Sequence, residues 1–345
     1  MPAVTDPSGR PRRSPSMADV AARAGVSHQT VSRVLNDAPS VKEATRTRVL
    51  AAITELGYRR NNAARMLVTN RSGRIGLVAA DLGLYGPSMT ALAVQDAAHE
   101  AGYEVAVVGL VEMSLELLSG AVERLLDQAV EAIVIAVAHR DALVTSRALR
   151  LPIPVVLVQG VVPGQPMAAG IDQEAGAVLA TGHLLELGHH RVAHVTGPDD
   201  WIEAGQRRAG WLRAHEERGG LPGPEITGDW SAASGYRAGL RLADDDSTTA
   251  VFVANDNMAL GLLRAMHERG RKVPGELSVV GFDDVPEAAF YWPALTTINQ
   301  AFGGAGRRAV ELALRALAGE PDPAAELIEP TLVVRNSTAA LRPRC

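Results

Sequence analysis

From Arg74 to about residue 300 the sequence alternates short apolar runs with amphipathic segments, and this alternation restricts the possible folds more than any other feature. Apolar runs bounded by turn residues predict buried strands, and the segments between them predict helices. Regular alternation is typical of a parallel, doubly wound sheet with helices on both faces. Two successive series predict two α/β lobes. The expected strands are 75–80, 104–108, 132–137, 155–158, 192–196, 251–254 and 277–281, and the expected helices are 89–101, 115–128, 173–187, 203–218 and 257–269.

The distribution of charge separates the front of the chain from its body. Residues 1–74 contain 13 Lys and Arg against 5 Asp and Glu, whereas the remainder contains 21 against 34. A basic N-terminal segment followed by an acidic remainder favours a polyanion-binding N-terminal domain joined to a ligand-binding or oligomerising domain. The length of 345 residues accommodates such an N-terminal domain of about 60 residues before a two-lobed core.

Composition argues against several classes of protein. Apolar residues make up 47% and charged residues 21%, which suits a packed globular chain. No apolar run approaches the roughly 20 residues of a membrane helix, and the start is basic, so we expect neither a membrane span nor a secretory signal. The single cysteine, Cys345, cannot form an internal disulfide or a thiolate metal site. These features predict a cytoplasmic protein.

The segment that begins at Ser16 has the signals of a short capped helix followed by a tight turn. Ser16 and Asp19 have the spacing of a capping box, in which each side chain bonds the other's backbone N–H. Gly25 can adopt the left-handed conformation that ends a helix, and Ser27 can cap the next one. The second helix is expected over 28–35 and a third over about 43–56. Three short helices with this turn form a helix-turn-helix bundle.

The second helix carries apolar residues on one face and base-reading residues on the other. Val31, Val34 and Leu35 recur at helical spacing and should be buried. Glutamine suits adenine, arginine suits guanine, and hydroxyls suit phosphate, so the outer face predicts a recognition helix in the major groove. A generic helical hairpin with a polar surface is the alternative. The candidate DNA-binding residues are Ser27, His28, Gln29, Thr30, Ser32, Arg33 and Asn36.

The headpiece resembles the LacI/GalR family of bacterial repressors. The resemblance is carried by DVAARAGVS at 19–27, by QTVSRVLN at 29–36 and by a hinge motif, Asn-x-x-Ala-x-x-Leu, that begins at Asn61. It implies that 61–73 forms a short hinge helix on DNA.

Within the hinge, the resemblance implies DNA contacts at Ala64 and Leu67. The leucine of family members wedges into a minor-groove base step, where the cost of partial unstacking is offset by contacts that both protomers make with the bent site. The alternative is that these apolar residues merely begin the core. Arg60 stands where the family commonly has proline, which weakens the expectation of a rigid hinge.

Polar residues follow the ends of the expected strands in the core. Gln159 follows 155–158, Asn255 follows 251–254, and Asp283 follows 277–281. Ligands of open α/β sheets bind outside the carboxyl ends of the strands, so two facing lobes predict a cleft lined by these residues. Carboxylates and amides that pair with adjacent hydroxyls, together with an aromatic ring such as Trp230, are typical of sugar sites.

The core also resembles the effector core of the family, with motifs at 228–231, 253–261, 278–284 and 295–300. The resemblance implies a type I periplasmic-binding-protein-like core with doubly wound parallel sheets. Similarity to lactose-type members implies effector contacts at Arg207, Trp230, Asn255, Asp283, Gln300 and Phe302, to which the strand-end rule adds Gln159.

Some of these residues have plainer explanations. Trp230 and Phe302 could simply pack the core, and Asp256 and Asp284 are expected to cap loops rather than to bind ligand. Two departures leave the preferred sugar open, because Ala80 and Gln159 stand where lactose-type members place a hydroxyl and a carboxylate.

Other patterns are discounted. The cluster His183, His189, His190 and His194 lies where a helix leads into a strand, so we expect no metal site. The glycines at 303–306 lack the strand and the lysine of a phosphate loop and are expected to form a helix-start turn. No nucleophile elbow or zinc-protease motif occurs, so we expect neither an enzyme nor a cofactor.

The sequence therefore predicts a sequence-specific transcriptional regulator that binds double-stranded DNA as a homodimer. No leucine heptads follow Arg335, which favours a dimer over a tetramer, and a two-fold dimer predicts a palindromic operator. A sugar in the cleft is expected to release a repressor. The alternatives are a corepressor-type regulator with a purine or phosphorylated effector, an extracytoplasmic sugar-binding protein and an enzyme.

The expected organisation follows from these assignments. It comprises a disordered basic arm at 1–15, the DNA-binding domain at 16–60, the hinge at 61–73, the core at 74–337 and a tail at 338–345. The N-lobe is expected at about 74–170 and 300–328, and the C-lobe at about 171–299 and 329–337.

Overall fold

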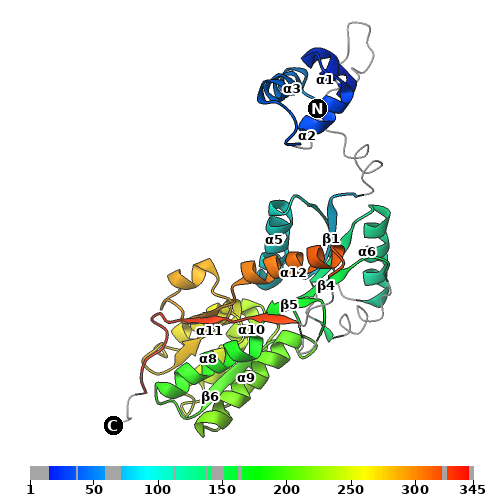
Figure 1. The fold of residues 1–345 in the computed structure, drawn as a ribbon. Coiled ribbons are helices and arrows are strands. Elements are labelled where there is room, and N and C mark those ends of the chain that lie inside the picture. The colour runs from blue at the N-terminus through cyan, green and yellow to red at the C-terminus, as the bar shows by residue number, and fades with distance from the viewer. Residues whose placement is uncertain are drawn as a thin grey trace, which may run out of the picture. The chain divides into compact units, whose positions relative to one another are not determined.

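The computed structural model describes the headpiece and most of the core, which form two compact units, 1–72 and 73–345 (Figure 1). The described residues are 15–35, 38–58, 71–111, 114–136, 139–140, 151–161, 165–320 and 325–341. Asn36, Ala64 and Leu67, together with nearly all of the expected basic arm and most of the expected hinge, lie outside them. The organisation expected over those segments stays a prediction.

The headpiece is a bundle of three helices, as predicted. The Ser16 N–H donates to Asp19 Oδ2 at 2.7 Å and the Asp19 N–H donates to Ser16 Oγ at 3.3 Å, which is the expected capping box. Gly25 ends the first helix at a φ of 63°. Val20, Val31 and Val49, one from each helix, are fully buried and hold the bundle together. The helices are α1 (Met17–Ala24), α2 (His28–Leu35) and α3 (Glu43–Leu56).

The N-lobe is built on a parallel sheet of six strands in the order β11-β5-β4-β3-β1-β2. Alternate side chains of β1 point to opposite faces, as the period of a strand requires. Ile75 and Leu77 pack under α5 and α12, whereas Val78 packs under α6. The elements are β1 (Arg74–Ala80), α5 (Tyr85–Glu100), β2 (Glu104–Leu110), α6 (Leu115–Asp127), β3 (Ala132–Ala136), β4 (Val155–Val158), β5 (Ala168–Ile171), α12 (Phe302–Leu317) and β11 (Glu326–Ile328).

The C-lobe is built on a parallel sheet of four strands in the order β7-β6-β8-β9. Trp211, Phe252 and Phe282 fill the layer beneath α8 and α9, and Val251 and Met258 belong to the layer beneath α10 and α11. The elements are α8 (Gln173–Glu186), β6 (Val192–Thr196), α9 (Ile202–Arg218), β7 (Glu225–Thr227), α10 (Ala232–Ala243), β8 (Ala250–Val253), α11 (Asp256–Glu268), β9 (Ser278–Val280) and the 3-10 helix η1 (Pro286–Phe290).

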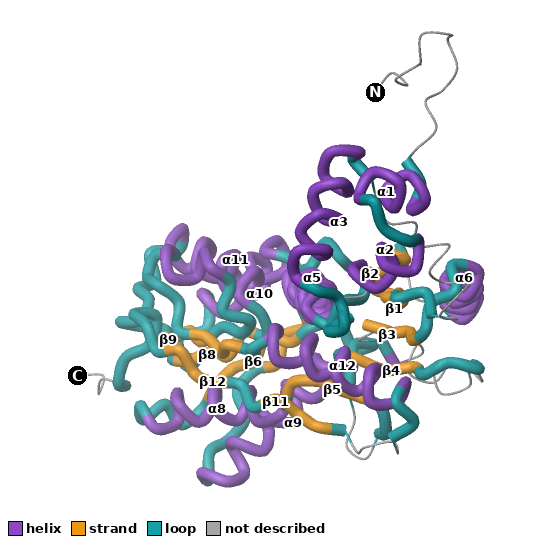
Figure 2. The backbone as a smooth tube through the Cα atoms, turned by 45° about the horizontal axis from the view of Figure 1, so that its top comes forward, coloured by secondary structure: helices purple, strands orange, loops and turns teal. Residues whose placement is uncertain are grey.

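The two lobes are joined by returns of the chain that sequence periodicity does not predict. Beside the C-lobe sheet, β10 (Thr297–Asn299) pairs antiparallel with β12 (Thr331–Val333). The chain leaves β10 to form α12 of the N-lobe, adds β11 to the N-lobe sheet, and returns as β12 (Figure 2). These strands contain only three residues each, too few for a period to be visible in the sequence.

One expectation about local structure was wrong, because the first core helix begins at Tyr85, four residues before the expected start. The glycines at 303–306 lie in the first turn of α12, at the helix start where they were expected. Gly306 allows close packing, because a β-carbon on it would lie 2.4 Å from Ala93 Cβ of α5. Among the described residues, no helix is both long and apolar enough to cross a membrane.

Close helix packing in the C-lobe gives a stability prediction. A β-carbon on Gly261 of α11 would lie 1.8 Å from the Ala232 carbonyl oxygen of α10. Gly261→Ala should therefore lower the free energy of unfolding by about 1–3 kcal/mol, because the helices must separate. Gly120→Ala is the control, since that exposed glycine of α6 has open space around it and alanine favours helix by roughly 0.5–1 kcal/mol. Urea unfolding followed by circular dichroism measures both, and equal effects would contradict the packing argument.

Candidate effector cavity and DNA-reading face

The outer face of α2 carries the polar residues that the sequence singled out. His28, Gln29 and Arg33 are exposed, whereas Val31 and Val34 are buried in the bundle. Ser27 begins the helix, because its Oγ accepts from the Thr30 N–H at 3.2 Å and lies 2.9 Å from Thr30 Oγ1. Ser32 is half-buried on the same helix. The bundle thus holds a rigid helix with three long polar side chains directed outward.

The core contains a small cavity between the N-lobe and the C-lobe, of about 30 Å³. All six residues expected from the family resemblance line it, although they come from α9, α12 and the ends of several strands. Gln159 is not among the lining residues. It lies next to one of them, because a β-carbon built on Gly86 would be 3.9 Å from Gln159 Nε2. The lining residues are Leu84, Tyr85, Gly86, Pro87, Trp201, Glu203, Arg207, Trp230, Asn255, Asp283, Gln300 and Phe302.

Arg207 occupies the centre of a buried polar network. Its Nε donates to Gln173 Oε1 at 2.9 Å, and Nη1 donates to the Ala254 carbonyl oxygen at 2.5 Å. The guanidinium carbon lies 4.0 Å from the centre of the Phe282 ring. Burial lowers the pKa of Arg207, and the nearby carboxylates, Asp283 first, oppose that effect. Hydrogen bonds and ring contact therefore stabilise a charge that water does not reach.

The network closes into a ring of four side chains, which we call the Arg207 ring: Arg207, Gln173, Gln300 and Asp283. Gln173 Nε2 donates to Gln300 Oε1 at 2.7 Å, and Gln300 Nε2 donates to Asp283 Oδ1. Asp283 Oδ1 lies 3.8 Å from Arg207 Nη1, which completes the ring. Burial raises the pKa of Asp283 to about 7, although Arg207 and the Gln300 hydrogen bond both favour the ionised form.

Trp230 forms an aromatic wall of the cavity in an unusual backbone conformation. Its φ is 68°, and Asn255 Nδ2 donates to its carbonyl oxygen at 3.1 Å. The ring lies directly over Gly197, where a β-carbon would come within 2.1 Å of it, so only glycine fits there. Trp201 meets the same ring edge-on at 5.3 Å. Within the part of the chain that the structure describes, the Trp230 indole N–H is buried without a hydrogen-bond partner.

A second aromatic pair lines the cavity from the N-lobe. Tyr85 and Phe302 meet edge-on at 5.8 Å between ring centres. Phe302 is the first residue of α12, so it packs a helix start and lines the cavity at once. Burial raises the pKa of Tyr85, and the nearby Asp283 adds to the effect. The cavity thus has aromatic rings on both lobes and amide and carboxylate groups between them.

Sequence reasoning missed Tyr85, Gln173, Trp201 and Glu203. A usable signal was present for three of them. Tyr85 follows the end of β1, and Trp201 and Glu203 follow the end of β6, where the strand-end rule applies as it does for Asn255. Gln173 also follows a strand end, that of β5, but no strand was predicted there from the sequence, so the rule could not be applied to it.

Of the two aspartates that were expected to cap loops, Asp256 bonds a loop backbone N–H, whereas Asp284 bonds the side chains of Asn299 and Arg335. Asp256 accepts from the Val285 N–H at 2.9 Å and from Thr297 Oγ1 at 2.6 Å. Asp284 Oδ1 accepts from Arg335 Nη2 at 2.6 Å. Neither lines the cavity. Among the described residues, no three His, Cys, Asp or Glu side chains are grouped as metal ligands.

The comparison with known proteins agrees with this architecture. A family model described as "Bacterial regulatory proteins, lacI family" matches residues 16–61, and one described as "Periplasmic binding protein-like domain" matches 181–338. The lactose operon repressor of Escherichia coli (strain K12) is 37% identical over 327 residues, which cover 93% of this chain and 90% of that protein.

This chain belongs to the LacI family. The family predicted from the headpiece is thereby confirmed, as is the fold class. The protein is a DNA-binding transcriptional regulator and not an enzyme.

Two solved structures have the same fold over nearly the whole chain. A lac repressor dimer bound to operator and the anti-inducer ONPF has a TM-score of 0.83 at 35% identity, and it covers 95% of this chain and 100% of that one. A complex of the transcriptional regulator CelR with cellobiose has a TM-score of 0.70 at 32% identity, with 94% and 99% covered. The two-lobed core of this LacI-family chain is therefore shared with proteins that were solved with small ligands.

The raised pKa of Asp283 makes stability depend on pH. The folded carboxyl keeps its proton up to about pH 7, whereas its ordinary pKa is 3.8. Its contribution to stability is therefore complete below about pH 4 and is lost as the pH rises through 7. Asp283→Asn cannot ionise, so between about pH 5 and pH 8 its free energy of unfolding should fall less than that of the wild type, by on the order of 1–3 kcal/mol. Urea unfolding across this range measures the difference.

The exposed Asp199 of the same lobe gives the control. Asp199→Asn should retain the slope of the wild type. Identical slopes for the wild type and Asp283→Asn would show that Asp283 is not the titrating group.

Proposed function

We propose that this LacI-family regulator is a repressor that a sugar inducer releases from a palindromic operator. The observation that carries the proposal is the cavity itself, in which two aromatic pairs flank amide and carboxylate groups. Aromatic faces stack on the C–H groups of a sugar ring, and planar amides and carboxylates bond its adjacent hydroxyls. The predicted effector residues Arg207, Trp230, Asn255, Asp283, Gln300 and Phe302 supply this chemistry, with Gln159 behind Gly86.

The size of the cavity supports a link between effector binding and movement of the lobes. Its volume of about 30 Å³ is far below the roughly 300–1,000 Å³ of small-molecule sites. A sugar therefore enters only if the lobes separate and close again around it. An effector that favours one lobe arrangement changes DNA affinity by as much as DNA changes effector affinity.

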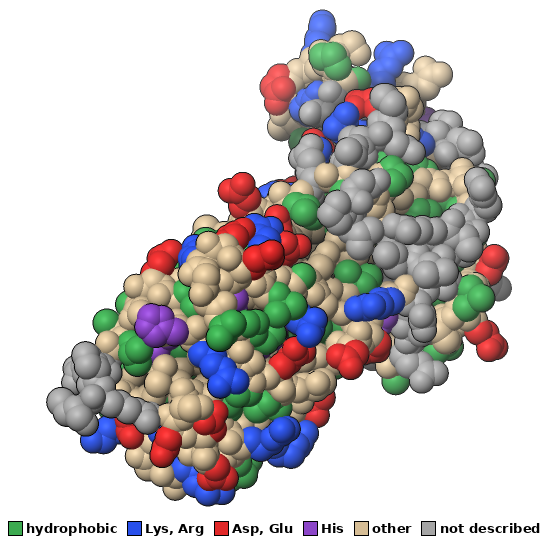
Figure 3. All heavy atoms as spheres, turned by 90° about the horizontal axis from the view of Figure 1, so that it is seen from below, with side chains coloured by type: hydrophobic (Ala, Val, Ile, Leu, Met, Phe, Trp, Pro, Cys, Tyr) green, Lys and Arg blue, Asp and Glu red, His purple; other side chains and the backbone are tan. Residues whose placement is uncertain are grey.

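On the DNA side, α2 acts as the recognition helix of the proposed repressor. His28, Gln29 and Arg33 reach base edges in the major groove, and hydroxyls such as that of Thr30 bind phosphate. Ser27, Ser32, Asn36, Ala64 and Leu67 complete the proposed DNA contacts. On the face of the molecule seen in Figure 3, acidic and basic side chains of the core are interspersed.

Fluorescence polarisation tests the function directly. The full chain is titrated onto DNA from upstream of its own gene, at low and high salt, with and without mono- and disaccharides. We expect tight binding that weakens steeply with salt and is reversed by one sugar.

Arg33→Ala should weaken binding about tenfold to a hundredfold, since a bidentate base contact contributes about 1–3 kcal/mol. Arg241→Ala, in the exposed part of α10, is the control.

Two results would contradict the proposal. If a purine or a phosphorylated metabolite tightened DNA binding and no sugar weakened it, the protein would be a corepressor-type regulator. If Arg33→Ala bound as well as the wild type, α2 would not read the operator.

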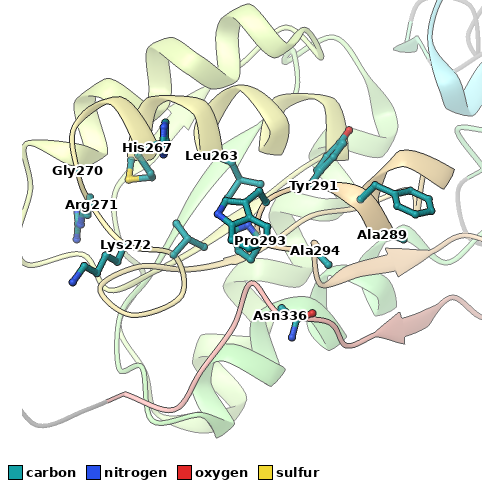
Figure 4. A pocket seen from close by; sticks show the side chains of 14 residues that line it. Leu263, His267, Gly270, Arg271, Lys272, Ala289, Tyr291, Pro293, Ala294 and Asn336 are labelled. Atoms are coloured by element: carbon teal, nitrogen blue, oxygen red, sulfur yellow. The ribbon is translucent and has the colours of Figure 1, made fainter.

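We also propose that the chain acts as a homodimer through an apolar surface beside α11. Phe290 and Trp292 are 88% and 92% exposed, which is unusual for large apolar side chains. They border a hollow of about 880 Å³ whose lining includes Leu263, His267 and Tyr291 (Figure 4). A second copy of the chain would bury this surface, and the similar lac repressor structure is described as a dimer.

Replacing the two aromatic residues tests the dimer. The double variant Phe290→Asp and Trp292→Asp should elute as a monomer, because two charges would have to be buried at the interface. Its operator affinity should fall about a hundredfold or more, since the second headpiece no longer binds at a high effective concentration. Leu221→Asp is the control, as Leu221 is 74% exposed outside this surface. A dimeric double variant in size-exclusion chromatography with light scattering would contradict the assignment.

A further inference from the structure

Glu203 is a buried carboxylate that faces the cavity from the first turn of α9. Only 8% of the residue is exposed. Burial raises its pKa, and Arg207 and the backbone N–H of Gly160 act in the opposite direction. Within the described part of the chain, no cation forms an ion pair with Glu203 within 4.0 Å. The carboxylate therefore retains unused acceptor capacity in a site with little water.

The position of Glu203 lies where the two lobes meet. Gly160 follows β4 of the N-lobe, whereas Glu203 belongs to the C-lobe. One turn further along α9, Gln206 Nε2 donates to the Val161 carbonyl oxygen at 2.8 Å. A ligand bonded to Glu203 therefore lies against both lobes.

The charges around the cavity are unbalanced. Among the described residues that line it, Glu203 and Asp283 are acidic and Arg207 is the only base. The Arg207 guanidinium donates to Gln173 and to the Ala254 carbonyl, and its charge lies 3.8 Å from Asp283 Oδ1, so the protein already pairs this charge with a carboxylate. The nearby Glu203 also raises the energy of the charged form of Asp283. An anionic ligand would meet two acidic side chains and a single cation whose charge one of them already pairs, at a high desolvation cost.

We propose that Glu203 sets the effector specificity of this chain by accepting hydrogen bonds from two hydroxyls of an uncharged sugar and by excluding phosphorylated and acidic sugars. The inference rests on the proposed function and adds the class of sugar and the residue that selects it. Trp201, two residues earlier, supplies a ring beside Trp230 on which the same sugar packs.

The test compares neutral sugars with their charged counterparts on the full chain. Glucose, galactose, cellobiose and lactose are titrated by isothermal calorimetry, alongside glucose 6-phosphate, galactose 6-phosphate, glucuronate and galacturonate. We expect a neutral sugar to bind, and its charged counterpart to bind about a hundredfold more weakly. Glu203→Gln should weaken the neutral sugar about tenfold to a hundredfold, since it loses charge-assisted hydrogen bonds, and should narrow the gap to the charged sugar.

A pH profile separates a direct contact from a structural effect. For the wild type, affinity for the neutral sugar should rise with pH as the two carboxyls ionise, Asp283 with a pKa of about 7 and Glu203 with a pKa that burial raises. In Glu203→Gln, only the pH dependence of sugar affinity that is due to Asp283 should remain. Glu203→Asp retains the charged carboxylate. It should therefore still exclude charged sugars, although its affinity for the neutral sugar should fall. Glu216→Gln, at an exposed glutamate of the same helix, is the matched control.

The outcomes distinguish this inference from the function on which it rests. If a neutral sugar bound but Glu203→Gln retained wild-type affinity, or if the phosphorylated sugar bound more tightly, the role of Glu203 would be wrong and the sugar-responsive function would stand. If no sugar of either kind bound to a chain that still bound DNA, both proposals would be overturned.

Discussion

The buried charge of Arg207 is the constraint on which the rest of the core depends. Only 3% of the residue is exposed, and an uncompensated guanidinium at that depth would cost several kcal/mol. The Arg207 ring and the Ala254 carbonyl stabilise this buried charge. Their groups come from the start of α8, the end of β8, and the segments that follow β9 and β10. One side chain thus fixes the relative positions of elements that are far apart in the sequence.

The same ring connects the site to the chain's passage between the lobes. Gln300 directly follows β10, and Phe302 begins α12 in the N-lobe two residues later. Between them, Ala301 adopts a left-handed conformation with a φ of 50°. A ligand that displaced the Gln300–Asp283 hydrogen bond would act on the segment in which the chain passes from β10 to α12 of the N-lobe. The hydrogen bonds that would recognise a ligand are therefore also the bonds that hold the segment connecting the two lobes.

The strand-end rule predicted part of the site for a clear physical reason. Parallel strands place their carboxyl ends at one edge, so Asn255 and Asp283 could be assigned together before any coordinates were known. The rule would also have found Trp201 and Glu203 after β6, had it been applied to every strand. Gln173 could not be found in this way, because β5, the strand of four residues that it follows, was not predicted from the sequence. The close contact of Gly306 with α5 could not be predicted, because that helix lies about 200 residues away in the sequence.

By itself, the sequence determined the local structure: the capped helices of the headpiece, the polar face of α2, the alternation that makes parallel sheets, and membership of the LacI family. These features depend on neighbouring residues, and capping and periodicity leave a direct trace in the sequence. Only the tertiary structure decided which polar side chains meet, that Glu203 faces Gly160 across the lobes, and that Phe290 and Trp292 remain exposed. Such contacts arise from burial and from bonds between distant segments, whose free energies no local pattern encodes.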